Sequence, residues 1–194
     1  MLFHFKTQFP ALNPYWDKYL EFQQRLEIPA KTTLLEEGKI SQQYIFIEKG
    51  AVRAFFNKEG IDKTVQFFFE NEGLTSFESF INSTPSRFAI ETIAPSIIYL
   101  LPKQYVLQLM DELRSEPDFV PMLLQIFAQR QNHYINEFVS FIHNTPEQHY
   151  QQLLSERPHI VQRVPQHYIA SYLGISSVHL SRIKSKLAKG KSHF

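Results

Sequence analysis

Cysteine is absent from the 194 residues, so the chain can form no disulfide, no zinc–thiolate site and no cysteine-ligated iron–sulfur cluster. The sequence also lacks the run of about 18 apolar, uncharged residues that a membrane-spanning helix needs. The segment from Met1 to Pro14 has one lysine and no continuous apolar stretch, unlike a secretory signal. We therefore expect a cytoplasmic protein with no membrane partner.

Acidic residues are absent after Glu156, although the whole chain has a net charge of only +1. The C-terminal stretch carries a charge of +7 and residues 1–156 carry −6. Its basic residues are Arg157, Arg163, Arg182, Lys184, Lys186, Lys189 and Lys191. A basic segment on an acidic body indicates a polyanionic partner for that segment, and a merely solvated tail would show the same charge.

Residues 30–101 contain short β-branched and aromatic runs separated by turn signals. The runs are Thr32–Leu35, Tyr44–Ile47, Val52–Phe56, Thr64–Phe69, Phe88–Ile93 and Ile97–Leu101. Four of the turn signals contain a glycine, at Gly38, Gly50, Gly60 and Gly73. Short strands at this spacing predict an all-β barrel or sandwich. We expect the run Phe67–Phe69 in its core.

Histidine is absent from residues 30–101, which excludes the histidine-ligated metal centre of a cupin enzyme or a haem sensor in this barrel. No nucleophile-elbow motif supports hydrolase chemistry. We therefore predict no enzyme activity, no catalytic residue, no metal site and no cofactor.

Helical patterns flank the barrel. Apolar residues at steps of three to four predict a short helix over residues 11–27, and Pro102 opens a second one that extends to about Leu113. A long helix is predicted over residues 118–143. Pro146 and Pro158 interrupt residues 144–163, where a hinge with one or two short helices is expected.

The long helix carries a seam of positions that alternate by four and three residues. They are Val120, Leu124, Phe127, Gln131, Tyr134, Phe138 and Phe141. This is the 3.5-residue period of a coiled coil and predicts a dimer interface. A second stripe, Phe119, Leu123 and Ile126 followed by Ile135, Val139 and Ile142, is expected to face the barrel, unless the helix is simply buried in a monomer.

Residues 166–185 match the requirements of a helix-turn-helix, two short helices joined by a tight turn. The apolar positions that must be buried are Ile169, Leu173, Ile175, Leu180 and Ile183. Ala170 lies where the helices approach closest. Gly174 lies at the turn, which favours positive φ, and Ser176 can cap the second helix.

The second helix leaves a polar face free to contact DNA. Arg182 could donate two hydrogen bonds to a guanine edge, and Val178 could touch a thymine methyl group. The full set of predicted DNA-binding residues is Gln166, Ser176, Ser177, Val178, His179, Ser181, Arg182, Lys184 and Lys186. The lysines are expected at phosphates, where they add affinity without sequence information.

The chain resembles the Crp/Fnr family of transcription regulators over nearly its whole length. In the barrel the resemblance is carried by residues 34–38, 44–50 and 85–90, and in the C-terminal part by residues 164–175 and 180–183. It implies a jelly-roll sensor related to cyclic-nucleotide-binding domains, a parallel helix dimer and palindromic DNA. By position, Ser177, Val178 and Arg182 match the family's principal base-contacting residues, and only Arg182 keeps the usual type.

Two departures from the family pattern concern the wing and the effector. The usual β-hairpin wing has no counterpart soon after Leu187, so we expect a short, wingless subgroup. Cyclic-nucleotide binders carry Gly-Glu and, about ten residues later, Arg-Ser or Arg-Thr; here Phe77 precedes Glu78, and Pro85 precedes Ser86. The candidate effector-binding residues are Glu78, Ser79, Ser86 and Arg87, with the effector either unidentified or dispensable.

These observations together predict an α+β chain. It comprises a jelly-roll sensor (residues 1–117), a dimerisation helix (residues 118–143) and an all-α helix-turn-helix domain (residues 144–194). The predicted function is DNA-binding transcription regulation by a homodimer, with RNA polymerase as a candidate partner. The alternative is a cyclic-nucleotide-type regulatory module that acts on protein partners.

Overall fold

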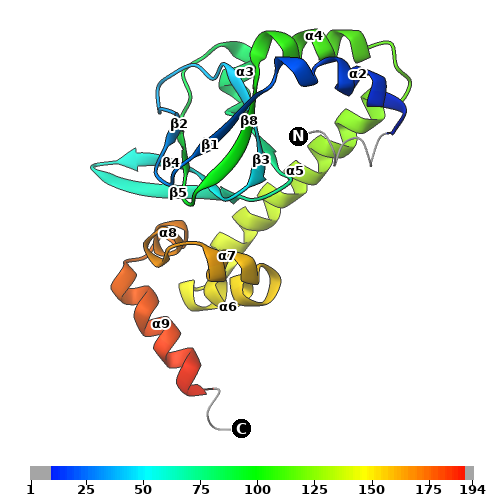
Figure 1. Ribbon diagram of the computed structural model, residues 1–194. Coiled ribbons are helices and arrows are strands. Elements are labelled where there is room, and N and C mark those ends of the chain that lie inside the picture. The colour runs from blue at the N-terminus through cyan, green and yellow to red at the C-terminus, as the bar shows by residue number, and fades with distance from the viewer. Residues whose placement is uncertain (1–9, 191–194) are drawn as a thin grey trace.

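The computed structural model describes residues 10–190 as a barrel, a long helix and a C-terminal group of helices (Figure 1). The helices are η1 (Pro10–Leu12), α2 (Asn13–Lys18), η2 (Leu20–Phe22), α3 (Phe77–Asn82), α4 (Lys103–Leu113), α5 (Phe119–His143), α6 (Pro146–Glu156), α7 (Pro158–Arg163), α8 (Gln166–Tyr172) and α9 (Ser177–Gly190). The strands are β1 (Gln24–Ile28), β2 (Thr33–Leu35), β3 (Gln43–Lys49), β4 (Val52–Lys58), β5 (Ile61–Phe68), β6 (Gly73–Leu74), β7 (Ala89–Thr92) and β8 (Ser96–Pro102). Lys191, one of the predicted basic residues, lies outside the described part.

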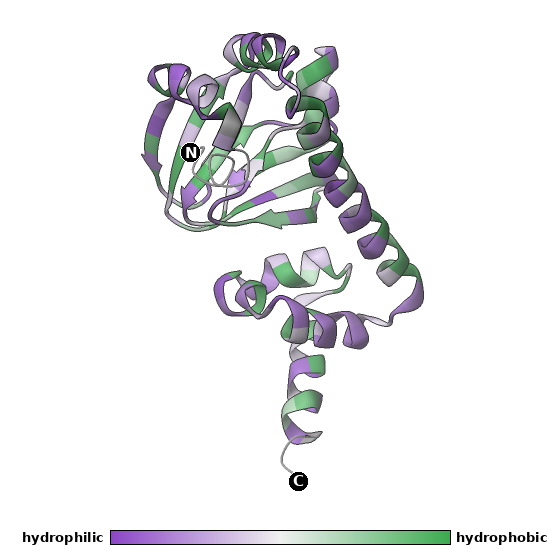
Figure 2. Cartoon of the chain, turned by 90° about the vertical axis from the view of Figure 1, so that its right-hand side faces the viewer, coloured by the Kyte–Doolittle hydropathy of each residue, from purple (hydrophilic) through white to green (hydrophobic). Residues whose placement is uncertain are grey.

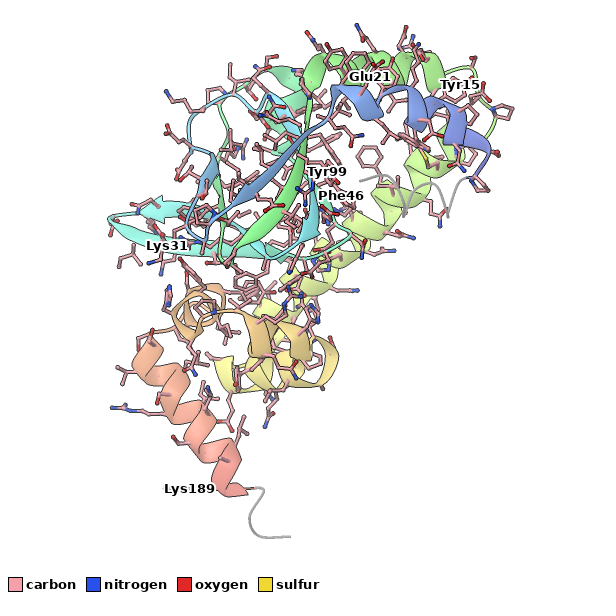
Figure 3. All side chains as sticks on the ribbon, in the orientation of Figure 1. Tyr15, Glu21, Lys31, Phe46, Tyr99 and Lys189 are labelled. Atoms are coloured by element: carbon pink, nitrogen blue, oxygen red, sulfur yellow. The ribbon has the colours of Figure 1, made fainter. Side chains whose placement is uncertain are left out.

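The barrel consists of two four-stranded antiparallel sheets, with strand orders β1-β8-β3-β6 and β2-β7-β4-β5. Strand alternation places one set of side chains between the sheets, where Ile47, Val52, Ile90 and Ile98 are fully buried. In the first sheet Phe46 pairs with Tyr99 across β3 and β8, and Figure 3 shows the two side by side. The predicted jelly-roll barrel is confirmed.

The prediction of a single helix over residues 11–27 is wrong at its C-terminal end. Helical structure stops at Phe22, and residues 24–28 form β1, which pairs with β8. The position of Leu26 fits both the next helical step after Phe22 and the alternation of a strand. The residues around it form a strand because they can pair with β8. Trp16 of α2 and Tyr19, the residue after that helix, pack instead with Leu109 of α4 and Met122 of α5.

The prediction that a second apolar stripe of α5 faces the barrel along its whole length is also wrong. Ile126 and Ile135 are nine residues apart, which is two and a half turns at about 3.6 residues per turn, so they face opposite sides. Phe119, Leu123 and Ile126 pack in the cluster with α2 and α4. Ile135, Val139 and Ile142 are exposed and widen the seam instead of facing the barrel.

The base of the β4–β5 hairpin is buried on both faces, which explains the three consecutive phenylalanines Phe67–Phe69. Phe68 points into the barrel. Phe67 and Phe69 point outward, into a second hydrophobic core that they share with the C-terminal helices. The C-terminal members of this core include Tyr150, Leu153, Ile160, Ile169 and Leu180. The barrel and the C-terminal helices are therefore joined by a continuous core.

Polar contacts reinforce this junction. Arg163 at the end of α7 donates to both carboxylate oxygens of Glu70, at 2.7 and 2.6 Å, and to the carbonyl oxygen of Gly50 at 3.0 Å. Figure 2 shows α6 to α9 gathered below the barrel, with α5 running along one side. Among residues 10–190, no helix combines the length and the apolar character that crossing a membrane requires.

The ion pair between Arg163 and Glu70 should make the free energy of unfolding depend on pH. The guanidinium of Arg163 lowers the pKa of Glu70 from 4.5 to about 2. A lowered carboxyl pKa adds stability above about pH 4.5, which is lost as the pH falls towards 2. Urea unfolding should therefore give a larger free energy of unfolding for the wild-type chain than for Glu70→Gln at pH 5, and this difference should shrink as the pH falls from about 4.5 to about 2. Arg163→Met should remove the same pH dependence. If the free energy of unfolding changed with pH equally in all three chains, the Arg163–Glu70 pair would not be its cause.

Candidate functional site

The α8–α9 pair has the predicted helix-turn-helix geometry. Helix α8 ends in a Schellman motif, in which the amide of Ile175 donates to the carbonyl oxygen of Ala170 and the amide of Gly174 to that of Ser171. Gly174 has φ +70°, and an added Cβ would meet nothing within 4 Å. The backbone conformation, and not lack of space, therefore favours glycine at this turn.

The predicted core and cap of the helix pair are confirmed. Ala170, Ile169, Leu180 and Ile183 are all at most 4 % exposed, and Ile175 packs at the edge of the same core. The hydroxyl of Ser176 accepts a hydrogen bond from the amide of His179 at 3.2 Å, which satisfies one of the free N–H groups of the first turn.

The outer face of α9 is open to solvent. Its exposed residues are Ser177, Val178, His179, Ser181, Arg182 and Ser185. Val178 is 63 % exposed although it is apolar. Figure 1 shows α9 projecting away from the barrel, and Figure 3 places Lys189 at its far end. This face can therefore enter a groove without displacing any part of the chain.

The remaining predicted DNA-binding residues are more varied. Gln166 is exposed at the start of α8, and Lys184 is half-buried. Lys186 donates to a carboxylate oxygen of Glu147 on α6 at 2.7 Å, with its side chain still 71 % exposed. Arg182, Lys184 and Lys189 have no ion-pair partner among the described residues.

Two of the four candidate effector residues lie inside the barrel and are already hydrogen-bonded. Ser79 is 1 % exposed, and its hydroxyl accepts from the amide of Ser41 at 2.9 Å. Ser86 is 3 % exposed; its hydroxyl donates to the carbonyl oxygen of Phe88 and is hydrogen-bonded to the hydroxyl of Ser76. A ligand that used either hydroxyl would have to replace these contacts.

The other two candidates form a surface ion pair. Arg87 Nη2 lies 3.4 Å from a carboxylate oxygen of Glu78, with the two side chains 81 % and 59 % exposed. Glu78 and Arg87 are thus paired with each other at the surface, whereas their neighbours in sequence, Ser79 and Ser86, are buried. An open hollow of about 370 Å³ lies elsewhere, lined by Gln42, Gln43, Pro102, Lys103, Gln104 and Leu107.

Arg53 was not singled out by the sequence analysis, yet it is the most buried charged side chain of the barrel's outer face, at 2 % exposure. The signal was present: it is the one charged residue in the apolar run from Ala51 to Phe56. A charge in such a run indicates burial with partners of opposite charge.

The predicted dimer seam is exposed in the single chain. Its six apolar residues are between 45 and 66 % exposed. At two points the seam also touches its own chain, because the ring of Phe127 contacts Phe77 of α3 and that of Phe141 contacts His149 and Tyr172.

Comparison with known proteins supports the fold and the sensor domain. Residues 25–112, from β1 into α4, match the cyclic nucleotide-binding domain family. A search of curated protein sequences finds no match. This match covers somewhat less than half of the 194 residues, so it describes the barrel and the start of α4 and not the whole chain.

Several solved structures share the fold of the whole chain. The c-di-GMP-responsive global regulator CLP of Xanthomonas campestris is 17 % identical, with a TM-score of 0.71 and coverage of 92 % of this chain and 93 % of CLP. FixK2 of Bradyrhizobium japonicum is 15 % identical, with a TM-score of 0.72 and coverage of 87 % and 86 %. The Thermus thermophilus catabolite activator protein is 18 % identical, with a TM-score of 0.51 and coverage of 92 % and 84 %. The resemblance to Crp/Fnr regulators is thus confirmed in fold and domain order.

Cyclic AMP is predicted not to bind in the family's usual way. Pro85 offers neither an N–H group nor a charge, Ser86 is buried and hydrogen-bonded, and Arg87 is paired at the surface. Isothermal titration with cyclic AMP and cyclic GMP should give a Kd weaker than about 1 mM, the same in wild type and Arg87→Ala. Micromolar binding that disappears in Arg87→Ala would show that the altered cassette works.

Proposed function

We propose that the chain is a cytoplasmic, dimeric transcription regulator that binds palindromic double-stranded DNA through α9 and catalyses no reaction. One observation supports this above all: a helix pair with a buried core, a capped second helix and a fully exposed polar face projects from the body. That geometry is the one required of a recognition helix in the major groove.

Within this proposal the residues of α9 have two roles. Arg182 donates to a guanine edge, Val178 contacts a thymine methyl group, and Ser177, Ser181 and His179 bond to bases or phosphates. Gln166 and Ser176 lie at the two helix starts, where phosphate contacts are favoured. Lys184, Lys186 and Lys189 neutralise phosphates. RNA polymerase and an unidentified small effector are the remaining candidate partners.

The dimer is formed by two parallel α5 helices. Six large apolar side chains of the seam are exposed in the single chain, and the C-terminal half of α5 adds Ile135, Val139 and Ile142 beside them. An exposed apolar surface of this extent marks an interface. A dimer of helix-turn-helix units needs half-sites about one turn of DNA apart, roughly 34 Å.

Arg182 is predicted to read a base, whereas Lys189 contacts only phosphate. Arg182→Ala should weaken binding to a selected specific site by about 1–3 kcal/mol and relax the preference at one base position. Lys189→Ala should weaken specific and random DNA alike and reduce the salt dependence. Fluorescence anisotropy over a salt series measures both. Equal losses on specific and random DNA in Arg182→Ala would contradict this role.

Point variants are a better test than truncation after Arg163. Removing residues 164–194 would expose Phe67 and Phe69 and disturb the barrel. The exposed Arg182 can be replaced without touching that core. If the wild-type chain binds every DNA as weakly as Arg182→Ala does, the alternative function through protein partners is favoured.

The dimer prediction is tested by a charge in the seam. Phe138 is 66 % exposed in the single chain, so Phe138→Asp should leave the protomer folded. Burying an unpaired carboxylate in the interface is costly, and light scattering should then show a monomer. Gln131→Asn is the matched control at the polar seam position and should stay dimeric. A wild-type monomer at micromolar concentration would contradict the proposed interface.

A further inference from the structure

Arg53 is the centre of a charge network between the barrel and the helix pair. It points outward from β4, and its guanidinium donates to Glu91 of β7 at 2.9 Å and to Asp62 of β5 at 2.6 Å. Two aromatic rings enclose it, Phe55 with its centroid at 3.7 Å and Tyr168 at 4.1 Å. Stacking between rings is a favourable environment for a desolvated guanidinium.

Tyr168 belongs to α8, so one wall of this enclosure comes from the helix-turn-helix. Its hydroxyl donates to the same Glu91 oxygen at 3.4 Å. If α8 moved away, Arg53 would lose a ring and its partners would be exposed to water. The burial of Arg53, at 2 % exposure, therefore depends on where α8 lies.

Ser171, one turn further along α8, binds the edge of the barrel directly. Strand β5 is an edge strand of its sheet. The hydroxyl of Ser171 donates to the carbonyl oxygen of Asp62 at 2.7 Å and accepts from the amide of Thr64 at 2.9 Å. One side chain thus satisfies two backbone groups that an edge strand otherwise leaves to water.

These contacts fix the direction of α9 as well. Helix α9 packs on α8 through Leu180 and Ile183, which are buried in the core that also contains Phe67 of β5. The orientation of α8 on the barrel therefore determines the orientation of α9. In this same docked arrangement the outer face of α9 and the seam of α5 are both exposed, so docking obstructs neither DNA nor a second copy.

We propose that Arg53 and Ser171 are positioning residues for DNA recognition, which hold α9 at a fixed angle to the dimer axis and so set the spacing between half-sites. This inference rests on the proposed function. The two residues contact no DNA. They act through α8, and their loss should broaden the accepted spacing while the bases read within each half-site stay the same.

The first arm of the test measures orientation without DNA. The absence of cysteine allows two spin labels at introduced cysteines, Glu36→Cys on the barrel and Lys189→Cys on α9. Labelled chains are diluted into an excess of unlabelled chains, so that only distances within one chain are recorded. The wild-type pair should give one narrow distance, and Ser171→Ala a broad distribution. A broad wild-type distribution, or no change in Ser171→Ala, would overturn the proposal.

Matched variants separate positioning from general damage. Ser171→Thr keeps the hydroxyl and should restore the narrow distance. Ser155→Ala removes a helical serine whose hydroxyl bonds only within its own helix, and should leave the distance unchanged. Arg53→Gln should broaden the distribution as Ser171→Ala does. If Arg53→Gln fails to fold, the three serine variants still decide the outcome.

The second arm measures spacing on palindromes whose half-sites are moved apart one base pair at a time. Wild type should prefer one spacing by about tenfold or more, equivalent to about 1.4 kcal/mol. Ser171→Ala should lose the preference for one spacing and keep the same sequence preference within each half-site. An unchanged spacing preference would overturn the proposal. A wild-type chain that binds no DNA but gives a narrow distance would contradict the proposed function alone.

Discussion

The burial of the base of the β4–β5 hairpin on both faces is the constraint on which the rest of the structure depends. One face, with Phe68, completes the barrel, and the other, with Phe67 and Phe69, completes the core of the C-terminal helices. A strand buried on both sides loses the usual alternation of apolar and polar residues. Both cores include residues of the hairpin, so the barrel and the helix-turn-helix are packed against each other and not merely linked in sequence.

This packing explains what is left exposed. The C-terminal helices lie on the barrel and cover little of the outer side of α5, whose apolar seam is largely exposed and contacts other described elements of the chain at Phe127 and Phe141. The positive charges of the C-terminal stretch are likewise divided between internal ion pairs and exposed positions. Arg163 pairs with Glu70 of the barrel, Arg157 with Glu137 of α5, and Lys186 with Glu147 of α6. Part of the basic segment thus serves internal contacts, and its described residues without an ion-pair partner, Arg182, Lys184 and Lys189, all lie on α9.

The polar residues around α3 differ in character from those where α8 packs on the barrel. Ser41, Ser76, Ser79 and Ser86 are buried and bonded to one another or to backbone, and the Glu78–Arg87 pair lies outside them. On the docking side, by contrast, a buried guanidinium and an edge strand are both completed by α8. The buried polar groups around α3 are therefore satisfied within the barrel, whereas those beneath α8 are satisfied by the helix pair.

The sequence by itself determined the elements whose signals are local. Gly174 and Ser176 fixed the turn and cap of the helix pair, and the runs ending at Leu35, Phe56 and Leu101 fixed strands of the barrel, because turn chemistry and periodicity act over a few residues. Tertiary structure decided what depends on distant partners. Only pairing with β8 made residues 24–28 a strand, and only the docking of α8 joined Ser171 to Thr64 across 107 positions. The sequence pattern around a residue can show that its side chain must be buried. Which surface buries it is determined by packing between elements that lie far apart in the chain.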